Sequence, residues 1–264
     1  MPSALLNGID VFYERSGEGR RLLFLNGSGA TIAASRILLT PFLARSDMVV
    51  ADQRGIGATS IPPGPYAMAD YATDAAALLD HLGWDSCAVV GISFGGMVAQ
   101  ELAVTWPNRI ERLALLCTSA GGPGGASYPL HELADLDPME RAALATRILD
   151  TRFTPEWLVE HDGDRVLAEL MAARGAAERS PEQRRGEAEQ MDARRRHDAW
   201  SRLPRITCPT LVAAGRYDGI APPPNAEAIA SRIDRAELRL YEGGHAFFAQ
   251  DRTALPEVLD FLDG

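Results

Sequence analysis

One serine of this chain has the sequence surroundings of an exposed nucleophile. Ser93 lies in the stretch AVVGISFGGMVAQ, where a short apolar run ends and a helical pattern begins. The pentapeptide GISFG matches the G-x-S-x-G pattern of a sharp strand-to-helix turn. Side chains two residues before and after such a turn collide, and Gly91 and Gly95 remove that collision. The pattern predicts a strained turn that presents the Ser93 hydroxyl at the tip of a strand.

A serine hydroxyl needs a neighbouring base to take its proton, and that base needs an acid to orient it. His245 follows the last predicted strand, in the loop YEGGHAFF, and Asp218 follows the strand TLVAAG, in the loop RYDGIAP. The carboxyl ends of parallel strands gather at one edge of a sheet, so these two residues and Ser93 are expected to converge there. The other histidines are expected at the surface or in packing positions: His81, His131, His161 and His197.

Strand-like and helix-like segments alternate along most of the chain. This alternation predicts a mostly parallel sheet with helices on both faces, because parallel neighbours need a crossover and helices usually supply it. Asn7-Gly8 predicts a type I′ hairpin turn near the start. Helices are expected at 33–45, 69–82, 94–106 and 225–233, with a last one ending near 262, and strands at 48–51, 86–90, 110–117, 210–215 and 236–241.

The alternation stops between residues 120 and 202. That segment begins with the flexible run SAGGPGGASYP and continues as charged, helix-forming sequence without a convincing strand. We therefore predict an α/β core of residues 1–119 and 203–264 with a helical lid of residues 120–202. Such a lid covers the strand ends, excludes water and shapes the substrate pocket. Its candidate substrate contacts are Trp157, Met171, Met191 and Trp200.

The lid carries the mixed-sign run RRGEAEQMDARRRHDAW. Alternating charge signs along a helix are typical of a solvated face, so the run is interpreted as such a face and not as an anion receptor. A pocket with few fixed charges suits a small to medium apolar ester or lactone better than a polyanion.

The chain order Ser93, Asp218, His245, with the acid after the next-to-last strand and the histidine after the last, is the order found in α/β-hydrolases. The whole chain resembles a lid-bearing member of the α/β-hydrolase fold superfamily and is similar to its serine esterase, enol-lactonase and cofactor-free haloperoxidase branch. The resemblance implies that Ser93 is the nucleophile, that His245 is the general base and acid, and that Asp218 orients the imidazole.

Stabilising an oxyanion takes two preorganised donors. One is expected from the Phe94 amide, at the start of a helix whose dipole favours negative charge. By the resemblance, the other comes from the loop that reads Asn26-Gly27-Ser28-Gly29, with the Ser28 amide as donor. Relatives commonly have histidine where this chain has Asn26, but a backbone donor does not depend on that side chain.

Two other sequence patterns give weaker evidence of a functional role. Gly27-x-Gly29 could open a dinucleotide fingerprint, but the third glycine position is occupied by Ile32. The segment DQRGIGATS resembles a turn of the same superfamily, and its Arg54 and glycines are interpreted as braces for loops near the site. No His, Cys or carboxylate cluster has metal-ligand spacing, so no metal and no cofactor is predicted.

Composition and charge limit the classes of partner and the location expected for this protein. The 264 residues are 46% apolar and 23% charged, as in ordinary globular chains, and the net charge of −10 disfavours nucleic acid and anionic lipid. The start shows no leader pattern and no window is apolar enough to cross a membrane, so a cytoplasmic location is expected. The cysteines lack CxxC spacing and are interpreted as small buried apolar residues: Cys87, Cys117 and Cys208.

The predicted chemistry is acyl transfer from a small-molecule carboxylic ester or lactone to water. Several activities share one triad in this superfamily, so 3-oxoadipate enol-lactonase-like, haloperoxidase or perhydrolase, acyltransferase and carbon–carbon bond hydrolase activities stay open. A non-catalytic ligand receptor is the alternative from a different class. No oligomeric state is inferred.

Overall fold

The computed structural model describes residues 3–176 and 178–264. In these residues eight strands form one sheet in the order β1-β2-β4-β3-β5-β6-β7-β8. β1 and β2 run antiparallel to their neighbours, and every other pairing in the sheet is parallel, so the predicted mostly parallel sheet is confirmed. The strands are β1 Ser3–Leu6, β2 Ile9–Ser16, β3 Arg20–Leu25, β4 Ser46–Ala51, β5 Cys87–Ile92, β6 Ile110–Leu116, β7 Thr210–Gly215 and β8 Ala236–Tyr241.

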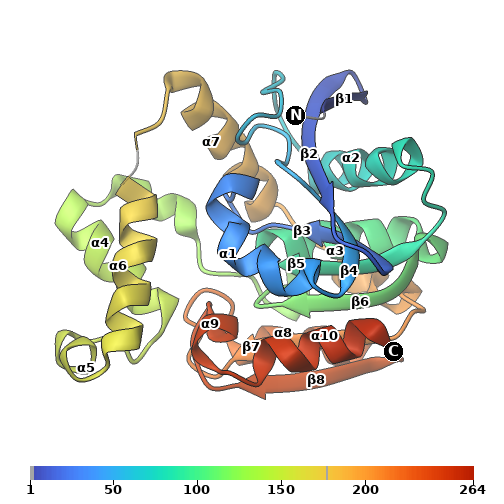
Figure 1. Ribbon diagram of the computed structural model, residues 1–264. Coiled ribbons are helices and arrows are strands. Elements are labelled where there is room, and N and C mark those ends of the chain that lie inside the picture. Colours follow the sequence, from blue (N-terminus) through green and yellow to red (C-terminus); the bar gives the residue numbers. More distant parts are fainter. Residues whose placement is uncertain (1–2, 177) are drawn as a thin grey trace.

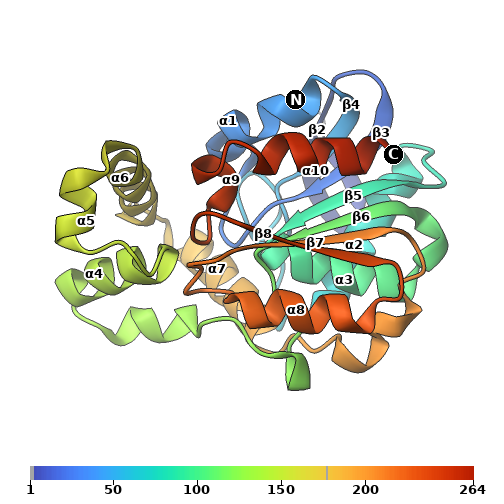
Figure 2. The ribbon, with the colours of Figure 1, turned by 90° about the horizontal axis from the view of Figure 1, so that it is seen from below.

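Helices cover both faces of the sheet, as predicted (Figures 1 and 2). One face packs against α1 and α10, and the opposite face packs against α2, α3 and α8, so the core consists of two apolar layers separated by the sheet. The helices are α1 Ile32–Leu43, α2 Met68–His81, α3 Phe94–Thr105, α4 Pro138–Leu149, α5 Pro155–Glu160, α6 Asp162–Ala176, α7 Pro181–Arg195, α8 Pro223–Arg232, α9 Phe247–Gln250 and α10 Ala254–Asp263.

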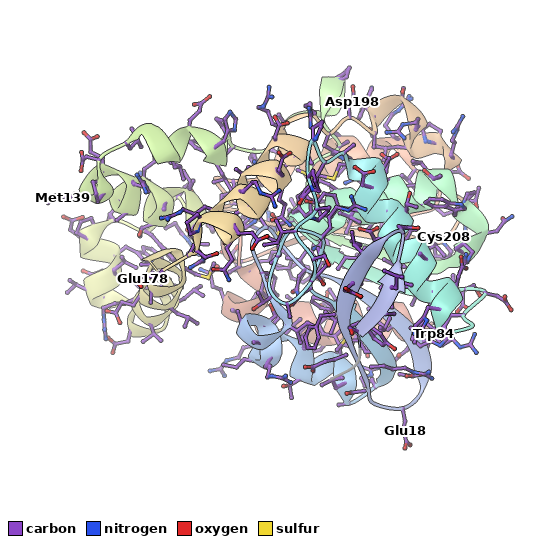
Figure 3. All side chains as sticks on the ribbon, turned by 90° about the horizontal axis from the view of Figure 1, so that it is seen from above. Glu18, Trp84, Met139, Glu178, Asp198 and Cys208 are labelled. Atoms are coloured by element: carbon purple, nitrogen blue, oxygen red, sulfur yellow. The ribbon has the colours of Figure 1, made fainter. Side chains whose placement is uncertain are left out.

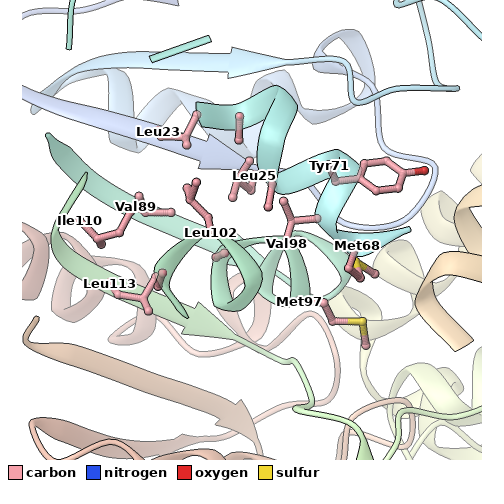
Figure 4. Packing of buried hydrophobic residues seen from close by; sticks show 14 of the residues in the cluster. Leu23, Leu25, Met68, Tyr71, Val89, Met97, Val98, Leu102, Ile110 and Leu113 are labelled. Atoms are coloured by element: carbon pink, nitrogen blue, oxygen red, sulfur yellow. The ribbon is translucent and has the colours of Figure 1, made fainter. Parts of the chain in front are cut away.

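β5 lies in the middle of the sheet, and every residue of its sequence CAVVGI is buried. A strand covered on both faces needs a continuous apolar run, and this requirement explains the absence of polar alternation before Ser93. α3, which follows directly, packs Met97, Val98 and Leu102 against the sheet and against Tyr71 of α2 (Figure 4). The turn between β5 and α3 is therefore fixed at both ends by buried elements.

Most local predictions for the core are confirmed by the structure. Asn7 and Gly8 have φ angles of 51° and 77°, which confirms the predicted hairpin turn. The strand and helix boundaries differ from prediction by one or two residues at most ends. The small helix α9 was not predicted, because four residues are too few to show a helical period. The three cysteines are free and buried, as interpreted from their spacing: Cys87, Cys117 and Cys208.

Residues between β6 and β7 form the helical insertion, with α4 to α7 and short 3₁₀ turns. Its two ends lie side by side, because Gly121 bridges to Asp198 and the Ala199 amide donates to the Ala120 carbonyl at 2.8 Å. α4, α5 and α6 stand beside the sheet (Figure 1), and α7 runs between them and the core, starting near Glu178 and ending near Asp198 (Figure 3). No helix of the described residues is long and apolar enough to cross a membrane.

Candidate active site

Ser93 occupies the sharp turn between β5 and α3. Its φ of 54° and ψ of −114° lie outside the conformations that residues with a side chain usually adopt. The surrounding chain holds this conformation, since the Ser93 amide donates to the Leu116 carbonyl at 2.8 Å and its carbonyl accepts from the Thr118 hydroxyl at 2.8 Å. Backbone strain of this kind persists only where neighbours over-determine it, and it is concentrated at functional sites.

The glycines around the serine permit close backbone contacts. A Cβ atom on Gly91 would lie 2.4 Å from the Gly95 carbonyl oxygen, and one on Gly95 would lie 2.0 Å from the carbonyl oxygen of Leu25 on β3. Both distances are too short for any side chain. Glycine at position 91 therefore lets the turn close on the start of α3, and glycine at position 95 lets it pack against β3. A Cβ on Gly27 would be 3.7 Å from the Ser93 Cβ, so the loop after β3 reaches the serine directly.

Gly95→Ala is therefore expected to lower the free energy of unfolding by about 3 kcal/mol or more, because the new methyl group meets rigid backbone. The measurement is the urea midpoint followed by circular dichroism. Gly163→Ala is the matched control: the position lies in α6 with no atom within 4 Å of an added Cβ, so stability should stay the same or rise slightly. Equal midpoints for the two variants would contradict the packing described for the turn.

His245 and Asp218 converge on the serine. The His245 Nε2 atom lies 3.0 Å from the Ser93 Oγ, and its Nδ1 lies 2.8 Å from the Asp218 Oδ2. The other oxygen of Asp218 accepts from the amides of Ile220 and Ala221 at 2.7 and 2.8 Å, so the buried carboxylate is held by its own loop. A carboxylate on Nδ1 favours the tautomer that carries its proton there and leaves Nε2 free to accept from the serine.

The helical insertion touches the loops that carry the histidine and the acid. At the end of α4, the Leu149 carbonyl accepts from the His245 amide at 2.6 Å, and the Ile148 carbonyl accepts from the Gly219 amide at 3.0 Å. Beside them the buried Asp150 accepts from Gln250 at 2.9 Å. Backbone contacts of the insertion thus help to position both loops, which the sequence did not indicate.

The loop Asn26 to Gly29 is fixed by two glutamines that the sequence analysis did not select. Gln53, within the DQRGIGATS segment, donates from Nε2 to the Asn26 carbonyl at 2.7 Å. Gln190, on α7, accepts from the Gly29 amide at 2.7 Å. Within the described part of the chain, the backbone amides of Ser28 and Phe94 donate to no protein acceptor, so both remain available to a bound group.

The DQRGIGATS segment acts as a brace, in agreement with its interpretation from the sequence. Besides the Gln53 bond, the buried Asp52 accepts from the amides of Ile32 and Ala58 at 2.7 and 2.9 Å. Burial raises the pKa of Asp52, and these backbone bonds counteract the rise. Arg54 forms a two-pronged ion pair with Asp74 of α2.

The predicted substrate contacts fall in different environments. Trp157 stacks on His161 with ring centroids 3.8 Å apart, and Met171 packs in the same small apolar cluster of the insertion. Trp200 packs against the main core, with the Arg232 guanidinium 5.0 Å from its ring. Met191 is half-buried on α7. Their contact with substrate stays a prediction, and the packing of the two tryptophans is explained without it.

The interpretation of the charged run as a solvated face is wrong for one side of α7 and the turn after it. Gln190, Arg194 and His197 are only 1%, 6% and 6% exposed. Their spacing of four and then three residues places them on one helix face, which turns toward the protein. The other charged residues of the run are exposed or half-buried. Burial lowers the pKa of His197 to about 4, so that side chain is neutral at physiological pH.

Fold and site geometry together define a class. A serine in a positive-φ turn at the end of a central parallel strand, followed along the chain by an acid and a histidine that hydrogen-bond to it in series, has the layout of an α/β-hydrolase. The family model described as alpha/beta hydrolase fold matches residues 20–251, and the chain belongs to this family.

Several known proteins of similar sequence and structure are hydrolases. The chain is 30% identical over 241 residues to 3-oxoadipate enol-lactonase 2 of Acinetobacter baylyi, a match covering 88% of this chain and 85% of the relative. It is 30% identical to a poly(3-hydroxyalkanoate) depolymerase of Ectopseudomonas oleovorans, over 91% of this chain and 83% of that protein. A solved hydrolase from Pseudomonas aeruginosa superposes with a TM-score of 0.82 at 31% identity, covering 100% of this chain and 98% of the other. These similarities support a hydrolase activity.

Proposed function

We propose that the protein hydrolyses a small-molecule carboxylic ester or lactone through a covalent acyl-enzyme on Ser93. The observation that carries this proposal is the continuous hydrogen-bonded series from the Ser93 Oγ through His245 to Asp218, with distances of 3.0 and 2.8 Å. A serine in this setting can be deprotonated as it attacks, because the imidazole accepts its proton and the buried carboxylate stabilises the resulting imidazolium.

The proposed reaction has two halves. In the first, the Ser93 Oγ attacks the carbonyl carbon and His245 Nε2 takes its proton; His245 then gives that proton to the leaving alcohol oxygen as the acyl–oxygen bond breaks. In the second, a water molecule attacks the acyl group, His245 takes a proton from it, and the proton returns to the Ser93 Oγ as the acid leaves. For a lactone, alcohol and acid belong to one molecule, and the product is a hydroxy acid. An enol lactone gives instead an enol acid, which tautomerises to the keto acid.

The Phe94 and Ser28 amides are proposed to bind the oxyanion in both halves. Phe94 is the first residue of α3, so its N–H lies at the positive end of the helix dipole. Ser28 belongs to the loop that approaches Ser93 through Gly27 and is fixed by Gln53 and Gln190. Donors held in place before the reaction contribute most to catalysis, because they need not reorganise when charge develops.

The insertion of residues 120–202 is proposed to act as the lid over this site, with residues 1–119 and 203–264 as the catalytic core. Support comes from its backbone contacts to the loops of His245 and Asp218. Gln190 also contacts the loop of residues 26–29, called the oxyanion loop below. The relatives named for a lactone and for a hydroxyalkanoate polymer favour esters and lactones as the substrate class.

A partition experiment tests the acyl-enzyme. Phenyl and p-nitrophenyl butyrate, which share an acyl group, are hydrolysed in the presence of methanol, and methyl butyrate and butyrate are quantified. A common acyl-enzyme predicts the same ratio of the two products from both esters, because the leaving group has departed before methanol or water attacks. A ratio that depends on the leaving group would contradict the intermediate, and absence of turnover on a wide ester and lactone panel would favour the receptor alternative.

Gln190→Leu is expected to lower kcat for p-nitrophenyl butyrate by about fivefold with little change in KM. The variant removes the acceptor of the Gly29 amide, so the oxyanion loop loses one of its two fixing bonds, and a hydrogen bond of this kind contributes about 1 kcal/mol. Steady-state kinetics measure the effect. Arg184→Leu, at an exposed position of the same helix, is the control and should behave as the wild type. An unchanged kcat in Gln190→Leu would show that the loop is held without α7.

A further inference from the structure

Arg194 on α7 is a buried cation that the proposed hydrolysis does not use. Only 6% of the residue is exposed, and its Nη1 donates to the Tyr128 carbonyl at 2.8 Å. Its Nε and Nη2 atoms are buried and have no hydrogen-bond partner. An unpaired donor edge on a buried guanidinium is unfavourable unless a partner binds there, because the charge has lost its hydration.

The free edge of Arg194 has the geometry that binds a carboxylate. Nε and Nη2 form one side of the planar guanidinium and point in parallel. The same edge holds a carboxylate elsewhere in this chain, where Arg15 binds Asp47 and Arg54 binds Asp74, each through Nε and Nη2 at 2.6 to 2.8 Å. Arg194 therefore presents, without a partner on this edge, the arrangement that other arginines of the protein use for carboxylates.

Two series of hydrogen bonds connect the buried face of α7 to the two loops that flank the reactive serine. Arg194 holds Tyr128, whose amide donates to the Ile220 carbonyl at 2.7 Å, and Ile220 in turn donates to Asp218. One helical turn before Arg194, Gln190 accepts from the oxyanion loop at Gly29. The buried face of α7 thus extends from the acid loop to the oxyanion loop, and Ser93 reacts between those two loops.

Gln190 adds a second donor on the same face. Its Oε1 is occupied by the Gly29 amide, which fixes the orientation of the side chain, and its Nε2 is buried without a partner. Residues four apart on a helix are neighbours, so Gln190 and Arg194 lie on adjacent turns of the same buried face.

The electrostatic setting agrees with an anion site. Burial lowers the pKa of Arg194, the Asp218 carboxylate partly offsets this, and the resulting pKa is about 10. The guanidinium is therefore charged at neutral pH. Asp218 is already engaged by His245 and by two backbone amides, and it does not contact the free edge of the arginine. A net charge of −10 gives the protein no general attraction for anions, so an anionic ligand needs a local cation of this kind.

We propose that Arg194, assisted by the Gln190 Nε2, binds a free carboxylate on the ester or lactone substrate. The proposal rests on the hydrolase function proposed above and narrows it to substrates that carry an anion besides the bond to be cleaved. The competing explanation is that Arg194 only balances the charge of Asp218, in which case its removal changes the hydrolysis of every substrate alike.

The test compares esters with and without the carboxylate. The anionic probes are p-nitrophenyl hydrogen glutarate, with the charge on the acyl part, and 4-(butyryloxy)benzoate, with the charge on the alcohol part; p-nitrophenyl pentanoate and phenyl butyrate are their neutral counterparts. The wild type is expected to prefer at least one anionic probe. Arg194→Gln should lower kcat/KM for that probe by about 10- to 100-fold, mainly through KM, and leave the neutral esters within about threefold, since a charge-assisted pair is lost. For the anionic probe, the kcat/KM of Arg194→Lys should lie between those of the wild type and Arg194→Gln.

Arg195→Gln is the matched control, because this neighbour is exposed and pairs with Asp192; it should leave all four rates unchanged. Equal losses on anionic and neutral esters in Arg194→Gln, or no anionic preference in the wild type, overturn the carboxylate site while the hydrolase function stands. Failure of the wild type on all four esters overturns both. If Arg194→Gln does not fold, the proposal is tested by inhibition of the wild-type hydrolysis of p-nitrophenyl pentanoate. Glutarate should inhibit more strongly than glutaramide, and equal inhibition contradicts the proposal.

Discussion

Replacing Ser93 with alanine is expected to lower kcat for p-nitrophenyl esters by about 10⁴- to 10⁶-fold, because the variant lacks the atom that forms the acyl-enzyme. The fold should survive. Among the described residues, the hydrogen-bond partner of the Ser93 hydroxyl is His245. The bonds that hold the turn come from main-chain atoms and Thr118, and alanine adds no bulk at φ 54°. Steady-state hydrolysis and thermal unfolding of the purified variant check both parts of the expectation.

Ser86→Ala serves as the matched control for the nucleophile. Ser86 lies before β5, at the opposite end of the strand from Ser93, and its hydroxyl bonds to Glu111. This variant should retain full activity. A Ser93→Ala protein that keeps more than about a hundredth of the wild-type kcat would remove Ser93 from the chemistry, since loss of a triad member costs several orders of magnitude.

Asp218→Asn is the second large effect, with an expected loss in kcat of about 10³- to 10⁴-fold and a nearly unchanged fold. One carboxylate oxygen of Asp218 accepts from the Ile220 and Ala221 amides, and the other accepts from His245. In the variant the backbone amides keep the amide oxygen on their side, so the NH₂ group faces the imidazole. It then donates to Nδ1 and forces the proton onto Nε2, where it blocks acceptance of the serine proton.

Steady-state kinetics and thermal unfolding measure this loss, and Asp260→Asn, an exposed carboxylate on α10, is the control that should leave activity unchanged. The tautomer argument also predicts that KM changes little, because the imidazole blocks proton transfer and not substrate binding. A kcat within about tenfold of wild type would show that Asp218 does not set the state of His245.

The sequence predicted the arrangement of the core for a physical reason. Continuous apolar runs mark buried parallel strands, and the carboxyl ends of such strands meet at one edge, so loop positions alone were enough to bring Ser93, Asp218 and His245 together. The sharp turn at Gly91 and Gly95 could also be predicted, because a close backbone approach requires glycine on both sides of the serine.

The insertion was harder to predict. A polar residue is normally exposed, so Gln190 and Arg194 in a run of mixed charge looked like part of a solvated face, whereas both are buried. Their spacing of four residues was the available signal, but it identifies a shared helix face without saying which way that face turns. The Gln53 contact to the oxyanion loop was also missed, since it joins two segments through a single side chain.

The most direct test of the account is the site of covalent modification by a fluorophosphonate, read by intact-protein mass and peptide mapping. The account predicts one phosphonyl group per chain, attached to the peptide that contains Ser93, with loss of esterase activity in proportion to labelling and no adduct on Ser93→Ala. An adduct on another residue that accompanies the loss of activity, or full activity in a protein fully labelled at Ser93, would contradict it.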